Sequence, residues 1–571
     1  MFKTNLNPKQ DHTHTFVTFD EHVSEQTRVE NFHIRRLGYL EKRSGVRVVF
    51  DLGAPIRALW SGLSQSAPIS YFLSGATVYA ASIAKRTATP IGKVDNSEGN
   101  ANFFALQGTL YLTDGGTKVY RIEKNAVVPV LGYVPLFGKD WDPQQVGEIY
   151  EPRNLLNRHA RITYIAPAMS TFLSLPPSVA SVDAVYRNGT LIPPEQYHFN
   201  KDYSVIEFSA FQKGDRAEVL LTFPESEEAN ALRPLFCSMK NSVFFCNEDK
   251  NRTFFFDGNG SNIVFCARYV SEELLDEARR YYDTDPLYLP EGYEFRVGDG
   301  TYPVRAAMPH YNSLLIFTEK DTWIADAASA GLSLYPTYPV NAELGCVTSN
   351  GCVLALNDPI TVSRQGIYRW ERQEPDDPRR TAVRISDELN RYLTAADLRE
   401  SSLFYDDANE ELWLNIRTKN EMWLCCPSVG VWYCFTGIVA DRIFDIDGTV
   451  AFTNGSQISV LDKSLLSDVD ILGQLKSIPV CYESAPFGFF EKPKNLVSFC
   501  TLADFGNSEI TLDLIEDNGK VTSALLKAPF RDGTRFRTHR LRSGRFRTAR
   551  FRLSGNKSGH VVIRAITFKT T

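Results

Sequence analysis

Short segments in which hydrophobic and polar residues alternate recur along almost the whole chain. Alternation with a period of two places successive side chains on opposite faces of a β-strand. The two clearest cases lie at 108–124 and 448–463, and each has Gly-Thr, an apolar strand, an Asp-Gly or Asn-Gly turn and a second strand. Because such dipeptides favour tight turns, both segments are predicted to be β-hairpins.

Related hairpin patterns occur elsewhere in the chain, at 75–85, 242–269, 313–326, 360–372 and 403–426. Antiparallel units that recur at about 40–50 residues are typical of the blades of a β-propeller. The likeness between the early hairpin at 108–124 and the late one at 448–463 indicates that N-terminal strands close the ring against C-terminal strands.

One region interrupts this rhythm. After a Pro- and Gly-rich stretch at 133–152, residues 160–223 form a compact run of predicted strands that indicates a small inserted β-sandwich. Helix is scarce: we expect helices at 271–282 and at 385–400, the second with Ser386 as its N-cap. The predicted fold is therefore all-β, a β-propeller with an inserted small β-sandwich and a C-terminal β domain.

A chain of 571 residues is too long for one hydrophobic core. The pattern divides it into five parts. These are an N-terminal arm (1–30), the first part of the propeller (31–150), the inserted β-sandwich (151–235), the remainder of the propeller (236–467) and the C-terminal β domain with a basic Arg hairpin (468–571).

Charge is strongly segregated. From Lys527 to Thr571 there are 13 Lys and Arg residues and one acidic residue, Asp532, which gives this segment a net charge of +12. Because the whole chain carries −6, the other 526 residues carry −18. Such segregation indicates a polyanion or an acidic protein surface as the partner of the C-terminal segment.

Two similar stretches carry most of this positive charge, RFRTHRLR at 535–542 and RFRTARFR at 545–552, with Ser543 and Gly544 as a predicted turn. Their alternation predicts strands with guanidinium groups along the face of a sheet. A solvated hairpin, or pairing with acids elsewhere in the fold, is the alternative. The candidate residues for a DNA channel or a subunit interface are Arg535, Arg537, Arg540, Arg542, Arg545, Arg547, Arg550 and Arg552.

Ten cysteines all follow Asn230, none in a C-x-x-C pair, and most lie in apolar strand-like segments. This favours buried free thiols and a reducing cytosol. The sequence has no apolar run of about 20 residues, and its N-terminus lacks the apolar core of a signal peptide. We therefore expect no membrane span.

Motifs that carry chemistry are scarce. The chain has no P-loop, H-E-x-x-H or G-x-S-x-G sequence. The run at 257–262 has the spacing of a calcium loop, but Arg268 stands where the closing acid should be, so a hairpin turn is favoured. The chain has enough acidic residues, such as Asp406 and Glu411, to supply the catalytic carboxylate pair of a glycosidase, so counting alone does not exclude one. We expect no catalytic residue, no metal and no cofactor.

Three segments resemble phage tail proteins of the nozzle type. In 29–62 the turn contains Gly38, Leu40, Lys42, Arg43 and Gly45, with Ser44 where proline is usual; 285–326 has a D-P-x-Y-x-P start and ends beyond Trp323. The third is 430–435 with the hairpin that follows it. The chain is thus similar to the podovirus-like tail nozzle, or tail tubular protein B, and to related head-to-tail DNA stabilisation proteins.

The resemblance implies a non-enzymatic virion protein, assembled in the host cytoplasm into a homo-hexameric ring of the phage tail. The ring would enclose the channel through which phage DNA leaves, between an adaptor or portal-side ring and fibre or tip proteins. Because eight Arg–phosphate contacts would hinder ejection, we favour a subunit interface for the Arg segment.

Two other functions stay open. One is a propeller that binds a receptor or glycan, for which the aromatic candidates are Trp323, Trp370, Trp413, Trp423 and Trp432, although inward-facing packing within the blades is the commoner explanation for such residues. The less favoured one is a propeller glycoside hydrolase.

Overall fold

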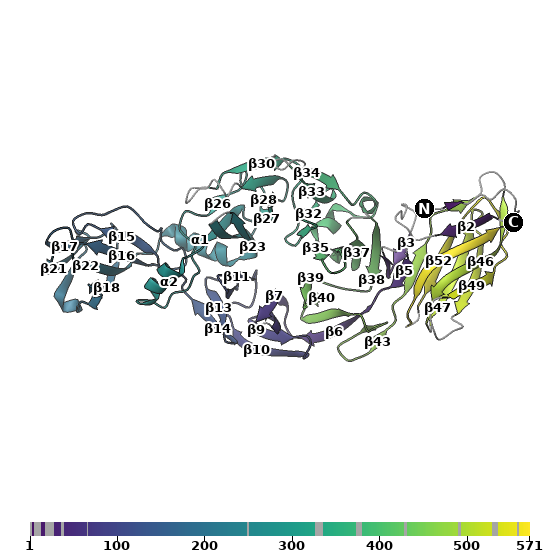
Figure 1. The fold of residues 1–571 in the computed structure, drawn as a ribbon, viewed down its shortest axis with the longest axis horizontal. Helices are drawn as coiled ribbons and strands as arrows, with labels where there is room; N and C mark the ends of the chain where they lie inside the picture. The colour runs from purple at the N-terminus through teal and green to yellow at the C-terminus, as the bar shows by residue number, and fades with distance from the viewer. Residues whose placement is uncertain are drawn as a thin grey trace.

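The protein consists of three β modules in a line, with a ring-shaped propeller in the middle and a β-sandwich at each end (Figure 1). The computed structural model describes residues 3–4, 13–17, 28–35, 39–64, 67–247, 250–325, 335–372, 380–427, 431–488, 493–506, 508–527, 535–556 and 559–570. All-β architecture is the fold class that the sequence predicted, and it is confirmed.

Seven sheets of the described chain form the propeller blades, each with four blade strands. The blade strands form where the sequence has hairpin patterns, because alternating residues place one set of side chains against the neighbouring blade. In ring order the blades are β7–β10 (Ile56–Ser64, Ala67–Ser74, Thr77–Ser82, Thr87–Lys93), β11–β14 (Asn102–Leu106, Thr109–Thr113, Val119–Glu123, Ala126–Val130), β23–β26 (Met239–Asn247, Lys250–Gly258, Ile263–Arg268, Phe295–Arg296), β27–β30 (Val304–His310, Ser313–Thr318, Thr322–Ala325, Thr337–Asn341), β31–β34 (Cys352–Ala355, Asp358–Ser363, Gly366–Glu371, Thr381–Arg384), β35–β38 (Ser401–Asp406, Glu411–Ile416, Glu421–Cys425, Trp432–Thr436) and β39–β41 with β6 (Arg442–Ile446, Thr449–Asn454, Gln457–Asp462, Gly45–Asp51).

The seventh blade closes the ring with strands from both ends of the chain. β6 pairs antiparallel with β41, with Val46 opposite Leu461. Phe72 of the first blade packs against Phe444 of the seventh, with ring centres 6.1 Å apart. The predicted closure of N-terminal against C-terminal strands is confirmed, as are the two hairpins that suggested it, now β12–β13 and β40–β41.

The inserted sandwich lies between the second and third blades and packs a five-stranded sheet on a three-stranded one. Every strand predicted between 160 and 223 is present. One strand was missed: β15 arises from the Pro- and Gly-rich stretch and pairs parallel with β16, and such a non-local pairing leaves no alternating pattern. The strands are β15 (Leu136–Trp141), β16 (His159–Ile165), β17 (Ser170–Ser174), β18 (Ser181–Arg187), β19 (Thr190–Leu191), β20 (Tyr197–Asn200), β21 (Val205–Phe211) and β22 (Arg216–Thr222), with a 3-10 turn at Pro194–Gln196.

The C-terminal sandwich packs two sheets around a large aromatic core, in which Phe551 of one sheet meets Phe568 of the other at 5.3 Å. One sheet contains β1 (Lys3–Thr4), β2 (Thr13–Val17), β4 (Phe32–Arg35), β5 (Tyr39–Lys42), β46 (Lys494–Asp504), β49 (Arg535–Arg540), β50 (Arg545–Phe546) and β52 (Val562–Thr570). The other contains β3 (Arg28–Glu30), β44 (Val480–Glu483), β45 (Phe487–Gly488), β47 (Glu509–Glu516), β48 (Val521–Lys527) and β51 (Thr548–Gly555).

The predicted N-terminal arm thus contributes strands β1, β2 and β3 to the C-terminal sandwich, while residues 5–12 and 18–27 lie outside the described chain. β3 also joins the sandwich to the propeller, because Glu30 pairs with Cys434 of β38 as well as with Cys481 of β44. A short hairpin, β42 (Asp468–Val469) with β43 (Leu475–Lys476), extends the seventh blade beside this connection.

Helices are few. α2 (Glu272–Arg279) lies where a helix was predicted, with Ser271 as its N-cap. The helix predicted at 385–400 is instead a 3-10 turn at Leu389–Arg391 and a short α3 (Ala395–Arg399); Thr394 caps α3, while the Ser386 hydroxyl accepts from the Ile367 amide. α1 (Glu227–Cys237) was missed because Pro234 obscured its pattern. None of the helices in the described part of the chain combines the length and apolar character that crossing a membrane requires.

Candidate interaction surfaces

The first Arg-rich stretch lies in one sheet of the C-terminal sandwich, and the second begins in that same sheet as β50, which pairs with β46, before it continues into the other sheet as β51. β49, from the first stretch, pairs with β46, and β51, from the second, pairs with β44 and β47. The predicted hairpin with a turn at Ser543–Gly544 is therefore wrong: the chain continues along β46 as far as Phe546, with the Ser543 amide donating to the Leu496 carbonyl, and crosses to the other sheet at Arg547. The physical reason is that each stretch has its own alternation of polar and apolar residues. The apolar residues of both stretches, such as Leu541 and Phe551, are buried in the shared core.

Of the six candidate arginines whose side chains are described, Arg550 and Arg552 pair within the chain. Arg550 Nη1 lies 2.6 Å from Glu483 Oε1, and Arg552 Nε donates to Glu483 Oε2 at 2.8 Å. Glu483 is only 6% exposed, so these two guanidinium groups neutralise a nearly buried acid. The alternative of pairing with acids elsewhere in the fold is confirmed for this pair.

Arg535 and Arg537 lie on β49, opposite Ala503 and Thr501 of β46. Their side chains fall outside the described part of the structure.

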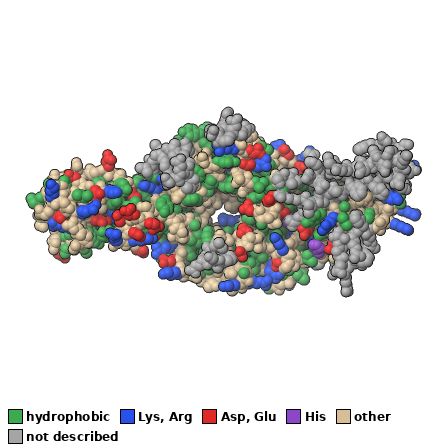
Figure 2. All heavy atoms as spheres, in the orientation of Figure 1, with side chains coloured by type: hydrophobic (Ala, Val, Ile, Leu, Met, Phe, Trp, Pro, Cys, Tyr) green, Lys and Arg blue, Asp and Glu red, His purple; other side chains and the backbone are tan. Residues whose placement is uncertain are grey.

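The other four arginines, Arg540, Arg542, Arg545 and Arg547, have exposed side chains between the end of β49 and the start of β51. We call them, with the exposed Lys520, the basic tip. Figure 2 shows Lys and Arg side chains projecting from the end of the molecule formed by this sandwich.

Two acids next to the basic tip hold its backbone in place. Glu516, 3% exposed, accepts from the Gly544 amide at 2.8 Å. Asp517 accepts from the amides of Arg547 and Thr548, which lowers the pKa of its carboxyl. Because both carboxylates bind backbone amides, the tip presents a cluster of cations on a fixed backbone.

A polar joint connects the propeller to the C-terminal sandwich. Arg43 is 1% exposed, and its Nη1 and Nη2 each lie 2.8 Å from a carboxylate oxygen of Asp468. Arg43 Nε donates to Asn31 Oδ1, and Nη2 donates to the Thr436 carbonyl. A single buried side chain therefore ties the N-terminal segment, the sixth blade and the β42–β43 hairpin together.

Lys42, next to Arg43, is also buried, and its Nζ donates to the carbonyls of Leu466 and Gly559 at 3.1 and 3.3 Å. Burial lowers the pKa of Lys42 to about 8. Gly45 follows in the same turn, where a Cβ atom would lie 2.0 Å from the Ser467 carbonyl oxygen. The Lys-Arg-x-Gly pattern that carries the family resemblance thus builds a structural joint.

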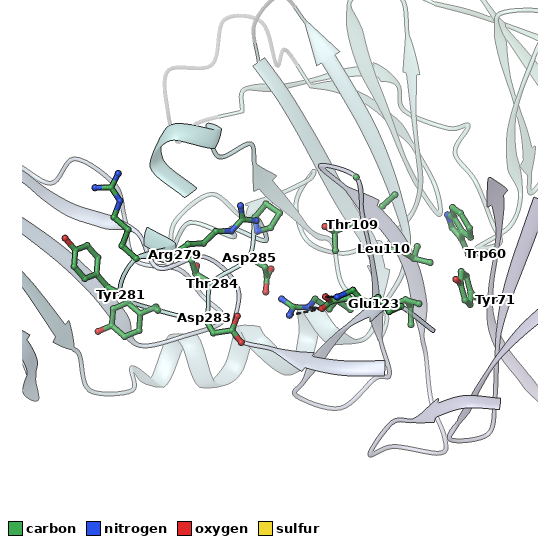
Figure 3. A pocket seen from close by; sticks show the side chains of 18 residues that line it. Trp60, Tyr71, Thr109, Leu110, Glu123, Arg279, Tyr281, Asp283, Thr284 and Asp285 are labelled. Atoms are coloured by element: carbon green, nitrogen blue, oxygen red, sulfur yellow. Dashed lines mark hydrogen bonds and ion pairs between the residues drawn. The ribbon is translucent and has the colours of Figure 1, made fainter. Parts of the chain in front are cut away.

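A large cleft lies between the first two blades and the segment after α2 (Figure 3). Its volume is about 1040 Å³. Trp60 and Tyr71 form an aromatic wall at one end, with ring centres 5.9 Å apart, and Arg279 and Tyr281 stand at the other end.

Two acids of this cleft, Glu123 and Asp285, are already engaged. Glu123 accepts from Arg121 Nε at 3.1 Å, and the buried Asp285 accepts from the Tyr111 hydroxyl at 2.9 Å. Burial raises the pKa of Asp285. The cleft therefore combines an aromatic wall with fixed charges, an arrangement suited to binding.

The other candidates from the sequence have structural places. Asp257, of the calcium-like run, is buried and pairs with Arg305 at 3.0 Å in the β24–β25 turn. The nine cysteines whose side chains are described are free thiols, as predicted. Within the described ranges, no three His, Cys, Asp or Glu side chains gather as a metal site would require.

The tryptophans proposed as sugar platforms are mostly buried. Trp370 and Trp413 have no exposed surface, and Trp432 is 3% exposed. Trp323 and Trp423 are half-buried, and their Nε1 atoms donate to Asp321 and Glu421. At least the three buried side chains are core residues, as the interpretation of these tryptophans as inward-facing blade aromatics predicts, and they offer no stacking surface to a sugar. Trp60, which lines the open cleft, was not among the candidates because its strand has an ordinary blade pattern.

No family model matches the chain, and no curated protein matches it. Among solved structures, the computationally designed Ika8 protein aligns with a TM-score of 0.31 at 8% identity, over 73% of this chain and 99% of that chain. The AfRom2 CNH domain aligns with a TM-score of 0.36 at 5% identity, over 73% and 99%. BamB from Moraxella catarrhalis aligns with a TM-score of 0.34 at 7% identity, over 81% and 99%. At such TM-scores these alignments carry no argument about function.

Proposed function

We propose that this protein is a structural component of a bacteriophage virion, the subunit of an oligomeric tail nozzle or head-to-tail ring. The ring encloses the DNA channel and retains or conducts the genome during ejection. The subunit acts by holding its shape under load, and no bond is made or broken by it.

The observation that carries this proposal is where the family-like segments lie. Two of them, 29–62 and 430–435, are distant in sequence but meet at the joint: the Asn31 amide donates to the Cys434 carbonyl at 2.8 Å. The third begins at the neck of the inserted sandwich, where the Leu155 amide donates to the Leu289 carbonyl at 2.8 Å. The segments that resemble the nozzle family thus fix the two end modules onto the propeller, which supports an architectural role.

The construction suits mechanical load. A propeller whose last blade contains strands from both ends of the chain leaves few unpaired strand edges, and opening it requires breaking a β6–β41 ladder within a packed core. The acidic body, at −18 outside the C-terminal segment, disfavours tight contact with DNA phosphates.

We assign the basic tip to an acidic neighbour in the assembly, since guanidinium groups form bidentate pairs with carboxylates at interfaces. The test is a variant with Arg540, Arg542, Arg545 and Arg547 all changed to Gln. We expect weaker assembly and unchanged affinity for duplex DNA. If the tip instead contacts phosphates, the slope of log affinity against log salt should become shallower by about 3 to 4 units in the variant.

The experiment that tests the proposal itself is electron microscopy of the purified full-length chain, together with native mass spectrometry. We expect closed rings with a central channel and a single dominant copy number, hexameric if the family pattern holds. A chain that stays monomeric at all accessible concentrations, or particles without a channel, would contradict the proposal.

A second candidate function, binding of a receptor or glycan, is favoured by one feature, the aromatic wall of the large cleft. Trp60, which is half-buried, offers a stacking surface that the buried tryptophans cannot, while Tyr71 beside it is only 7% exposed. A glycan array should then show specific signals that are lost in Trp60→Ala and kept in Trp323→Phe. Equal signals for wild type and Trp60→Ala would remove this candidate.

A further inference from the structure

One short hairpin of the propeller exposes large apolar side chains. Leu472 and Leu475 of the β42–β43 hairpin are 79% and 71% exposed, and Ile471 is 45% exposed. We call these three side chains the apolar knob. Grouped apolar exposure of this kind marks a surface that another protein covers.

The knob is held in a fixed shape. Asp470 Oδ1 accepts from the amides of Leu472 and Gln474 at 2.9 and 2.8 Å. Gly473 occupies the left-handed region with a φ of 82°, which a residue with a side chain rarely adopts. A preorganised knob loses little conformational entropy on docking, so its apolar area is available for affinity.

A matching recess lies on another side of the ring, between the second and third blades. Its volume is about 250 Å³, and its walls include Ala105, Leu106, Thr253, Phe244 and Tyr269. Phe244 and Tyr269 are 58% and 43% exposed, so this recess has an apolar, open mouth. We call it the blade recess.

Two of the polar side chains that line the blade recess, Gln107 and Arg252, already have partners. Gln107 exchanges two hydrogen bonds with the backbone of Val270, at 2.8 and 3.0 Å. Arg252 donates to the Tyr335 hydroxyl and to the Asn251 carbonyl. An apolar side chain can enter without stripping these groups of their hydrogen bonds.

Two further cavities in the described part of the chain fit the knob less well. The large cleft is rimmed by the exposed Arg279, Arg280 and Asp283, whose burial under an apolar side chain would be costly. The cavity beside the seventh blade is lined by Leu475 and Asp470 of the hairpin itself, so the same hairpin cannot fill it.

We infer that the apolar knob of one subunit docks into the blade recess of a second copy of this chain. The hairpin extends the seventh blade, and the recess lies between the second and third, so the two surfaces are on different sides of the propeller (Figure 1). Contacts between two different patches are heterologous, and they generate closed rings or open filaments. The inference rests on the proposed function, because it supplies the contact that builds the ring.

The test uses two variants of the full chain, Leu472→Glu in the knob and Phe244→Glu in the recess. Leu191→Glu is the control, since Leu191 is 53% exposed on the inserted sandwich, away from both surfaces. Native mass spectrometry gives the copy number, and thermal unfolding checks that each variant folds. Each test variant should dissociate to monomers, with the subunit dissociation constant raised at least about thirtyfold, while the control assembles like the wild type.

Mixing the two test variants distinguishes this contact from any other. The intact knob of Phe244→Glu can still enter the intact recess of Leu472→Glu, so the mixture should form dimers and nothing larger. Oligomers that survive both substitutions would overturn the inference and leave the ring standing. Loss of assembly in the knob variant alone would also overturn it, since that result indicates a symmetric contact between hairpins. A monomeric wild type would remove both the ring and this contact.

Discussion

Replacing Arg43 should loosen the joint between the propeller and the C-terminal sandwich. The Arg43→Ala variant removes two hydrogen bonds to Asp468 and one each to Asn31 and Thr436. Breaking a buried ion pair by removing one partner typically costs about 3–5 kcal/mol. Asp468 still accepts a hydrogen bond from the Val46 amide, and its side chain is 16% exposed. We therefore expect the free energy of unfolding to fall by about 3 kcal/mol, the lower end of this range.

Two companion variants make this test specific. Arg384→Ala removes an ion pair with Asp387 whose side chains are 44% and 66% exposed, and it should cost less than about 0.5 kcal/mol. Replacing both charged partners, as Arg43→Met with Asp468→Asn, should cost less than Arg43→Ala alone, because no charge is left unpaired.

The assay is guanidinium unfolding followed by hydrogen exchange, because a chain with three modules need not unfold in one step. We expect an earlier first transition in Arg43→Ala and faster amide exchange at residues 28–35 and 431–436. A midpoint no lower than that of Arg384→Ala, with unchanged exchange in those two segments, would refute the role given to Arg43.

Three further predictions concern stability and reactivity. Burial lowers the pKa of Lys42 from 10.5 to about 8, so between these pH values the folded state has released a proton that the unfolded state still binds. The free energy of unfolding of the wild type, relative to that of Lys42→Met, should therefore rise as the pH is raised from 8 to 10.5. A difference that is independent of pH would contradict this. Trp370→Ala should cost about 3–5 kcal/mol, since the side chain has no exposed surface, and calorimetry showing an unchanged transition would argue against the packing of the fourth and fifth blades. Burial raises the pKa of Cys237, Cys266 and Cys346 to about 12, so a thiol reagent at pH 8 should leave them unmodified until the protein unfolds; rapid labelling of the native protein would show that these sites are open.

Local patterns predicted the strands well. The turn dipeptides at 114–115 and 454–455 place β12–β13 and β40–β41 correctly, because a tight turn and the two strands that it joins are encoded within about 15 residues. The closure of the ring could be predicted only because the early and late hairpins happen to resemble each other.

Long-range partners were harder to predict. β49 and β51 have the alternation of two strands joined by a turn, yet they pair with β46 and β47 in different sheets. Alternation determines which side chains face a core, but it leaves open which strand lies alongside. The same limit explains why the contribution of the N-terminal strands β1–β3 to the C-terminal sandwich was not foreseen.

The surfaces were the least predictable part. The Arg-rich stretches are visible from composition, but only the structure separates Arg550 and Arg552, which bind Glu483, from the exposed basic tip. Leu472 and Leu475 look in sequence like any core leucines, since exposure depends on how far the β42–β43 hairpin extends from the blade.

Cryo-electron microscopy of the purified full-length chain is the most direct test of an architectural role. We predict class averages of a closed ring around an open channel, with the β42–β43 hairpin of each subunit against the Phe244 side of the next. Isolated single propellers at concentrations well above micromolar would contradict a ring-forming subunit.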